Sequence, residues 1–277
     1  MKIAYCGYDF FHACLAELLL AGMDVYRVFT VTCDNRVNFN QYIYQLCEKN
    51  NIPVSEQPIT EETIKQLQSE GCELLIAAAY NYKIPSLSET RIKGINIHPT
   101  LLPIGRGVWP LPWTILTDQK QSGVSIHKLT EEYDAGNILI QRSFPVAPDE
   151  RLESLSAKVQ LLARNMILDV ALNFEHYWGT AVAQSGDVTI WNSPSKEQRR
   201  LSWEKNVGEL DRICRAFGKF GCFANFENKN WIVYGLSAWE QLHDFTIGSV
   251  VHKTNTEMIV AARDGLVSLL YFEPDSL

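Results

Sequence analysis

The first part of the chain alternates between two hydrophobic patterns. Nearly continuous apolar runs at residues 2–5, 25–31 and 74–79 are typical of strands that are buried on both faces. Between these runs, apolar residues recur three and four positions apart, and this spacing predicts helices over residues 11–19 and 60–70. Because strands and helices follow one another in turn, the pattern predicts an α/β fold with a doubly wound, mostly parallel sheet.

The pattern continues with two shorter strands and one long helix. Residues 94–98 form a short run that Pro99 stops, and residues 123–129 alternate in the way of a further strand. Residues 151–178 carry apolar side chains along one helical face. We therefore expect two more strands followed by a long amphipathic helix.

The texture of the chain changes near its last quarter. Residues 185–202 are polar, which is typical of a linker. A helix predicted at 207–217 is followed by short strands near residues 222–227, 231–236, 247–252, 257–262 and 266–272. Their close spacing predicts a small barrel. The expected organisation is a domain over residues 1–184, a linker over 185–202 and a small β-barrel-like subdomain over 203–277.

The composition narrows the class of protein. The 277 residues are 46% hydrophobic and 21% charged, as in an ordinary globular protein, and no apolar stretch is long enough to span a membrane. The net charge is −7, and after Trp203 ten acidic residues outnumber seven basic ones, which weighs against nucleic-acid binding. The seven cysteines show no Cys-x-x-Cys spacing and the start shows no signal-peptide pattern, so we expect reduced thiols and a cytoplasmic location.

The strand at residues 94–98 carries the first candidate chemistry. Asn96 and His98 alternate along it, so both side chains leave the same face of the sheet. Pro99 ends the strand, and ligands of open α/β sheets bind at the carboxyl ends of strands. Taken alone, such a histidine is more often a hydrogen-bonded core residue than a catalytic one.

A second candidate is Asp134, which stands in a turn-forming Asp-Ala-Gly context before the apolar run at 138–140. On its own, Asp134 fits better as a turn residue whose side chain bonds the local backbone. Ser125 and His127 lie close by in the sequence, and we interpret them as strand residues that face solvent or a hydrogen-bonded core.

Together these segments resemble the 10-formyltetrahydrofolate-dependent formyltransferase family, over roughly residues 1–200. Asn96, His98 and Asp134 match the catalytic residues of the family one for one. Thr100 stands where many members carry serine, which is a conservative departure. The motif that carries the resemblance reads, in order, Asn96-x-His98-Pro99-x-Leu101-Leu102-Pro103, Arg106-Gly107, Ser122-Gly123-Val124 and Asp134-x-Gly136.

The resemblance implies a formyltransferase with a Rossmann-like sheet and N10-formyltetrahydrofolate as the formyl donor. An amine would attack the formyl carbon, and Asn96 would donate a hydrogen bond to the resulting oxyanion, a contact worth about 2.7–4 kcal/mol in acyl-transfer enzymes. His98 would take the proton of the amine or, when protonated, stabilise the oxyanion. Asp134 would orient the imidazole. The chemistry calls for neither a metal ion nor a covalent intermediate.

The resemblance also suggests where folate and acceptor bind. The loop at 79–85 would wall one side of the folate, and the loop at 130–134 would hold the pterin largely through backbone groups. The folate-binding candidates are Ala79, Tyr80, Asn81, Lys83, Ile84, Thr130, Glu131 and Tyr133. The acceptor-binding candidates are Tyr8, Phe10, Arg106 and Trp109. Tyr80 fits a packing role equally well, and the aromatic acceptor candidates fit the core more readily.

Three acceptors compete: glycinamide ribonucleotide, methionyl-tRNA and a nucleotide-linked amino sugar. The loop at 5–10 has a single glycine and an acid, which makes a poor phosphate cradle for the ribonucleotide. Residues 31–40, where tRNA enzymes should carry a basic insertion, contain one arginine offset by one aspartate. The segment 106–113 looks like the sugar group.

We therefore expect an enzyme that N-formylates a nucleotide-linked amino sugar for surface-glycan biosynthesis. Methionyl-tRNA formylation is the first alternative, because the tail after Trp203 fits both groups. The second alternative is a non-catalytic folate-binding module. A homodimer is common in the sugar group, although the sequence leaves the oligomeric state open.

Overall fold

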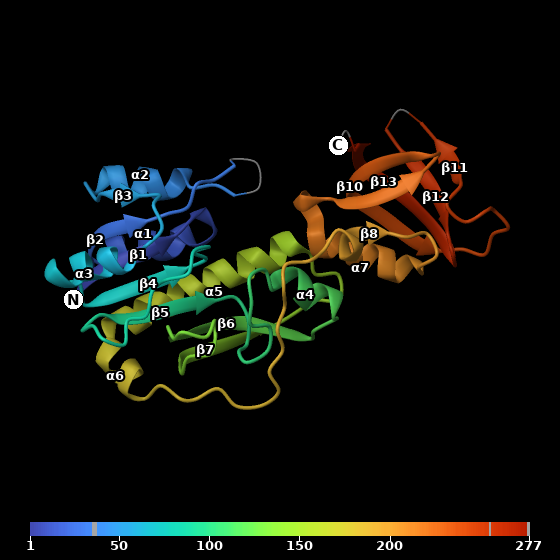
Figure 1. Ribbon diagram of the computed structural model, residues 1–277. Coiled ribbons are helices and arrows are strands. Elements are labelled where there is room, and N and C mark those ends of the chain that lie inside the picture. The colour runs from blue at the N-terminus through green and yellow to red at the C-terminus, as the bar shows by residue number, and fades with distance from the viewer. Residues whose placement is uncertain (35–37, 255, 276–277) are drawn as a thin grey trace. The chain divides into compact units, whose positions relative to one another are not determined.

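A computed structural model describes residues 1–34, 38–254 and 256–275, and these residues divide into two units, each built around one sheet (Figure 1). The first unit comprises Met1–Pro110, Gln121–Pro145 and Ala157–Trp191. The second unit comprises Leu111–Lys120, Val146–Ser156 and Asn192–Leu277.

The sheet of the first unit has seven strands in the order β3-β2-β1-β4-β5-β6-β7. Strands β1 to β5 pair in parallel, whereas β6 and β7 pair antiparallel. The predicted mostly parallel sheet is therefore confirmed, with an antiparallel extension at one edge. Its strands are β1 (Lys2–Gly7), β2 (Asp24–Phe29), β3 (Val54–Ser55), β4 (Leu74–Ala78), β5 (Lys93–His98), β6 (Gln121–Lys128) and β7 (Ile138–Pro145).

The helices begin and end where the sequence offers caps. Thr60 accepts a hydrogen bond from the backbone N–H of Thr63 at 3.2 Å, which closes a capping box at the start of α3. The single helix predicted over 151–178 is divided at Asn173, whose side chain donates to the carbonyl of Asp169 at 3.2 Å. These helices are α1 (His12–Leu20), α2 (Gln41–Lys49), α3 (Glu61–Ser69), α5 (Leu152–Leu172) and α6 (Phe174–Gly179).

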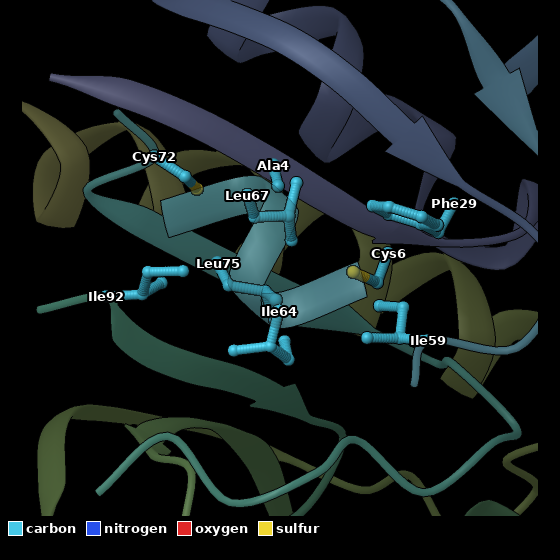
Figure 2. Close-up of a cluster of buried hydrophobic side chains, with 9 residues drawn as sticks. All are labelled: Ala4, Cys6, Phe29, Ile59, Ile64, Leu67, Cys72, Leu75 and Ile92. Carbon is cyan, nitrogen blue, oxygen red and sulfur yellow. The ribbon is translucent and has the colours of Figure 1, made fainter. Parts of the chain in front are cut away.

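Alternate residues of β1 face opposite layers of helices. Ala4 and Cys6 point into a buried cluster with Ile64 and Leu67 of α3 (Figure 2). Tyr5 points the other way, and its hydroxyl donates to the carbonyl of Phe11 at 2.9 Å, just before α1. Both faces of the sheet are therefore covered, which explains why β1 reads as a continuous apolar run.

Helix α5 lies on the same face of the first sheet as α1. Arg164 of α5 and Glu17 of α1 form an ion pair at 2.5 Å, which ties the two helices together. Figure 1 shows α5 running behind strands β4 and β5. The buried side chains of α5 include Val159, Met166 and Val170. This helix therefore supplies much of the second layer.

The order of the strands reverses between β1 and β4, the place where open α/β sheets bind ligands. Gly7 ends β1 opposite Ala78 of β4, and a Cβ on Gly7 would lie 2.3 Å from the carbonyl oxygen of Ala78. Only glycine allows these two strand ends to lie this close together.

The second unit contains a six-stranded sheet in the order β11-β12-β13-β10-β9-β8. Helix α7 (Val207–Phe217) buries Leu210, Ile213, Cys214 and Phe217, as the sequence predicted. Among the described strands the pairing is that of an open sheet, from β11 at one edge to β8 at the other. The strands are β8 (Arg200–Leu201), β9 (Cys222–Phe226), β10 (Lys229–Glu240), β11 (Val250–Lys253), β12 (Met258–Ala262) and β13 (Gly265–Pro274).

The two units are interleaved along the chain. The second unit includes α4 (Leu111–Leu116), which the sequence analysis missed and which packs against α7. It also includes residues around Glu150, whose carbonyl accepts a hydrogen bond from Arg215 at 2.7 Å. The sequence boundaries at 184 and 203 describe contiguous pieces instead, and independent folding of residues 203–277 stays a prediction.

Two further expectations concern the chain as a whole. Within the described ranges, no helix combines the length and apolar character needed to cross a membrane. All seven cysteines are free thiols, and all except Cys33 are buried. They therefore behave as small apolar side chains, as the sequence indicated.

Candidate active site

Strands β5 and β6 bring polar side chains together on one face of the first sheet. Asn96 and His98 of β5 lie directly opposite His127 and Ser125 of β6, respectively. Residues that face each other across an antiparallel pair lie on the same side of the sheet. Ser125 is bonded within the core, since its hydroxyl donates to the carbonyl of Thr100 at 2.6 Å.

Asp134 joins the two histidines and the amide. Its Oδ1 lies 3.2 Å from Nδ2 of Asn96, 3.4 Å from Nδ1 of His98 and 3.4 Å from Nε2 of His127. The Asp134 side chain is only 10% exposed. The structure therefore brings the three predicted catalytic residues into contact at one carboxylate oxygen, and it adds a fourth.

The turn between β6 and β7 holds Asp134 in place. Asp134 adopts the left-handed backbone region, with φ +54°, and its Oδ2 accepts a hydrogen bond from the N–H of Gly107 at 2.9 Å. Two residues later, a Cβ on Gly136 would lie 1.9 Å from the carbonyl oxygen of Lys128. Aspartate tolerates the left-handed region better than most residues, and glycine is required where the turn touches β6.

The hydrogen bonds of His98 decide which nitrogen carries its proton. Nε2 lies 2.8 Å from the carbonyl oxygen of Gly105, which can only accept, so Nε2 donates. Burial lowers the pKa of His98, while Asp134 and the Gly105 carbonyl oppose that shift. At neutral pH the imidazole is therefore neutral, and its Nδ1 lone pair faces Asp134.

His127 is the residue that sequence reasoning set aside. Its Nδ1 donates to the carbonyl of Lys128 at 2.9 Å, so its Nε2 accepts from Nδ2 of Asn96 at 3.1 Å in the neutral ring. The Asn96 amide thus directs one hydrogen at His127 and the other at Asp134. The alternation of residues 123–129 placed Ser125 and His127 on one face, but the pairing register with β5 was not readable from it.

Asp134 stays ionised well below neutral pH. Burial by itself would raise the pKa of this carboxyl group, but the nearby His127 and His98 rings and the Gly107 N–H outweigh burial and lower the pKa to about 2. The site therefore holds a buried carboxylate against a neutral His98 at neutral pH.

The folate-binding candidates lie on two loops, after β4 and after β6. Ala79 has a φ of +58° at the end of β4, and Tyr80 accepts a hydrogen bond from the N–H of Ile59 at 3.3 Å. Tyr80 and Ile84 also pack against the cluster of Figure 2, so both have a packing role. The exposed members are Asn81, Lys83, Thr130, Glu131 and Tyr133. The Lys83 ammonium lies 6.0 Å from the centre of the Tyr133 ring, which brings the two loops together.

The acceptor-binding candidates follow β1 and β5. Tyr8 and Phe10 are half-buried, and burial raises the pKa of Tyr8 to about 12. Arg106 donates to the side chains of Gln184 and Glu132. Trp109 is half-buried three residues further along the same loop. All four emerge beyond the carboxyl ends of parallel strands, although no direct contact among them defines a pocket.

The acid in the loop after β1 has a structural partner. Asp9 accepts hydrogen bonds from the N–H groups of Tyr42 at 3.1 Å and Ile43 at 3.0 Å, at the start of α2. A carboxylate thus occupies the helix N-terminus that lies nearest this loop. This contact agrees with the prediction that the loop is a poor phosphate cradle. Asn35, Arg36 and Val37 of the expected insertion lie outside the described residues.

Over the same described residues, no group of three or more His, Cys, Asp or Glu side chains is arranged to hold a metal ion. The Asn96, His98, His127 and Asp134 cluster is instead a set of hydrogen-bond donors and acceptors around one carboxylate. Such a set suits proton transfer and the stabilisation of an oxyanion. A doubly wound sheet with this cluster at a strand end defines a site for acyl-group transfer.

The chain belongs to the formyl transferase family. Residues 7–171 match the family described as formyl transferase, and residues 194–276 match the formyl transferase C-terminal domain. The match of the first region covers the whole Asn96, His98 and Asp134 cluster.

Relatives of this chain fall into more than one group of formyltransferases. The methionyl-tRNA formyltransferase of Lactobacillus gasseri is 26% identical over 272 residues, which cover 94% of this chain and 86% of that protein. An N-formyltransferase from Helicobacter canadensis, solved with folinic acid and dTDP-3-aminofucose, has a TM-score of 0.72 at 15% identity and covers 99% of this chain and 100% of its own.

A third likeness is to HypX from Aquifex aeolicus, solved in complex with tetrahydrofolic acid. It has a TM-score of 0.75 at 21% identity over the whole of this chain, which spans 44% of the HypX chain. The structural likenesses show the fold. The sequence relatives named here are methionyl-tRNA enzymes, so the expected placement in the sugar group is not established by them.

Proposed function

We propose that this formyltransferase moves the formyl group of N10-formyltetrahydrofolate to the primary amine of a nucleotide-linked amino sugar. The observation that carries the reaction type is the contact of Asn96, His98 and Asp134 at one buried carboxylate oxygen. The solved proteins of similar fold that hold folinic acid or tetrahydrofolic acid support the choice of donor.

The proposed reaction forms one C–N bond and breaks another. The acceptor amine attacks the formyl carbon, and the carbonyl oxygen becomes an oxyanion. When the bond to folate N10 breaks, the formyl group stays on the acceptor and N10 receives a proton. We assign the oxyanion contact to Asn96, whose N–H bonds to His127 and Asp134 are long, at 3.1 and 3.2 Å, so that one can be exchanged for the formyl oxygen.

His98 is suited to accept the proton of the attacking amine. Burial lowers the pKa of its imidazole, so the neutral form is present at physiological pH. Once Nδ1 is protonated, both ring nitrogens face acceptors, namely the Gly105 carbonyl and the Asp134 carboxylate. Asp134 would therefore stabilise the imidazolium exactly where it forms and not in the resting state.

The exposed loop residues are the proposed folate contacts. The loop at 130–134 leaves several backbone groups exposed next to the Asp134 turn, and Lys83 and Tyr133 meet at its side. A pterin presents paired donors and acceptors, which exposed backbone can match. Tyr80 and Ile84 would contribute through the backbone of their loop, since their side chains pack inward.

The acidic character of the chain favours a sugar nucleotide over tRNA. Formylation of tRNA requires contact with a polyanion, and the net charge here is −7. A sugar nucleotide offers far fewer phosphates, and the aromatic candidates Tyr8, Phe10 and Trp109 lie on the loops after β1 and β5. A homodimer and a cytoplasmic location remain predictions.

Methionyl-tRNA formylation is the second candidate. The relative from Lactobacillus gasseri favours it, because its similarity extends over 94% of this chain. The C-terminal region, residues 194–276, matches a domain shared across the family and does not separate the two acceptors.

A direct assay separates the candidates. Purified protein is incubated with N10-formyltetrahydrofolate and either a panel of nucleotide-linked amino sugars or methionyl-tRNA, and products are read by mass spectrometry for the gain of one formyl group. We expect turnover of at least one amino sugar and negligible formylation of methionyl-tRNA. The His98→Ala variant is the control for chemistry. Formylation of methionyl-tRNA at a rate comparable with that of any sugar would reverse the assignment.

A further inference from the structure

Gln184 connects Arg106 to the turn that carries Asp134. Its Nε2 donates to the carbonyl of Asp134 at 2.6 Å and to the carbonyl of Gly136 at 2.9 Å. Its Oε1 accepts from Nε of Arg106 at 3.2 Å and from Nη2 at 2.9 Å. The amide thus uses both of its hydrogens and both acceptor positions of its oxygen.

The orientation of this amide is determined by its partners. The guanidinium of Arg106 offers only donors, whereas the two backbone carbonyls offer only acceptors. Turning the Gln184 amide by half a rotation would place donor against donor and acceptor against acceptor. A side chain held in this way has a single arrangement, so it can fix the position of the turn.

Arg106 is itself anchored by its backbone. Its N–H donates to the carbonyl of Thr189 at 3.0 Å, and its carbonyl accepts from the N–H of Trp191 at 2.7 Å. The next residue, Gly107, donates its N–H to Oδ2 of Asp134. Two neighbouring residues therefore hold Asp134 from two sides: Gly107 holds the carboxylate directly, and Arg106 holds the backbone through Gln184.

The turn needs such support because of its conformation. Asp134 has a φ of +54°, which is disfavoured for residues that have a Cβ. Its Oδ1 must at the same time remain within reach of Asn96 and His98. Relaxation of the backbone towards a favoured region would move the carboxylate away from both partners.

From these contacts we infer that Gln184 is a positioning residue for Asp134, and that Arg106 acts through Gln184 rather than by binding the acceptor. The inference rests on the proposed formyl transfer, since positioning matters only if Asp134 serves that reaction. It differs from the sequence-based expectation, which placed Arg106 among the acceptor-binding residues.

The test uses the full-length chain with variants of both residues. Gln184→Ala removes the amide, and Gln184→Met keeps the length of the side chain without its hydrogen bonds. Arg106→Met removes the donors to Gln184, and Arg106→Lys restores one donor. Ser185→Ala, at the exposed neighbour of Gln184, is the matched control. Circular dichroism and thermal melting establish that each variant is folded.

The first readout is steady-state kinetics. We expect kcat to fall by between about 10-fold and 10²-fold in Gln184→Ala, Gln184→Met and Arg106→Met, because a misplaced catalytic group costs rate rather than affinity. The KM of the acceptor should stay within about twofold, and Arg106→Lys should recover part of the lost rate. A raised KM with unchanged kcat in Arg106→Met would show that Arg106 binds the acceptor and would overturn the inference.

The second readout does not depend on activity. The Asp134 carboxylate raises the pKa of His98 against the effect of burial. If Asp134 moves away, the pKa of His98 measured by NMR of its ring should fall in both Gln184 variants, as in Asp134→Asn, and should stay unchanged in Ser185→Ala. An unchanged His98 pKa in the Gln184 variants would overturn the inference, even with reduced turnover. Failure of the wild-type protein to formylate any amine would count against the proposed function alone, because the titration still reports on the position of Asp134.

Discussion

Nε2 of His127 lies 3.4 Å from Oδ1 of Asp134, the same oxygen that faces His98 at the same distance. Two imidazoles therefore share one carboxylate oxygen, and each has its other nitrogen on a backbone carbonyl. The arrangement gives the rings different partners on the Asn96 side, since only His127 is within hydrogen-bond distance of the amide. The two histidines should thus differ in their effect on turnover.

Loss of Asn96 or His98 should remove most of the activity. Asn96→Ala deletes the proposed oxyanion donor and His98→Ala the proposed base, so each should lower kcat by about 10²-fold or more. Folate binding, measured by fluorescence or calorimetry, should survive in Asn96→Ala because the exposed loops remain. Near-normal turnover in either variant would remove these residues from the mechanism.

His127→Ala should have a smaller effect than His98→Ala. His127 accepts from Asn96 and so fixes the direction of its amide, but it takes no proton in the proposed reaction. We expect a fall in kcat of about 10-fold, the scale of a supporting contact that loses its orientation. Ser122→Ala is the matched control on the same strand, because the buried Ser122 hydroxyl has no hydrogen-bond partner and its removal should be neutral. Equal losses for the two histidine variants would mean that His127 takes part in proton transfer.

Activity should decline on the acid side of neutrality. His98 must be neutral to accept a proton, and burial lowers its pKa below the ordinary value of 6.5. Plotted against pH, kcat/KM should therefore be level near pH 7 and fall only below the ordinary histidine range. A midpoint above 6.5 would contradict this assignment. In Asp134→Asn the midpoint should move to still lower pH, since the charge that opposes the effect of burial is gone.

Stability should also decrease in acid, with a known sign. The pKa of Asp134 is depressed to about 2 in the folded chain, from 3.8. The carboxylate therefore stabilises the fold fully above pH 4, and this contribution disappears as the pH falls through 2. His98 acts in the same direction at higher pH: the unfolded chain binds a proton at its ordinary pKa before the folded chain does. Chemical denaturation at pH 7 and pH 5 should show His98→Gln losing less stability than wild type over this interval.

The turn at Gly136 should not accept a side chain. A Cβ there would lie 1.9 Å from the carbonyl oxygen of Lys128, which is backbone and cannot move aside alone. Gly136→Ala should therefore cost about 3 kcal/mol, within the usual range of overpacking, and displace Asp134. Gly179→Ala is the matched control, since nothing lies within 4 Å of its added Cβ. A fully active Gly136→Ala variant would contradict the role given to this turn.

Local sequence predicted the elements that depend on local rules. Helix α3 begins after Thr60 because its hydroxyl and that of Thr63 close a capping box, and α7 begins after Asn206 for the same reason. The long helix over 151–178 was wrong in one detail, because the side chain of Asn173 bonds the backbone one turn earlier and a new helix starts there. Helix α4 was missed: it has only six residues, and the sequence around Pro112 gives little periodicity.

The residue pattern also located Asn96, His98 and Asp134, since the first two share a strand face and the third lies in a turn. What it could not supply was the third dimension of the site. His127 joins the cluster only because β6 pairs with β5 in the register that sets it opposite Asn96, and a shift of one residue would turn it to the other face. Arg106 and Gln184, 78 residues apart, meet only in the folded chain.

The sequence by itself thus determined which residue types are present and on which local element each stands, because turns, caps and strand periodicity act over a few neighbours. Tertiary structure alone decided that Asp134 serves two histidines, that Gln184 holds its turn and that the second unit draws in residues 111–120 and 146–156. These contacts join segments distant in sequence, and they form because strand register and the packing of apolar faces are settled by the whole chain together.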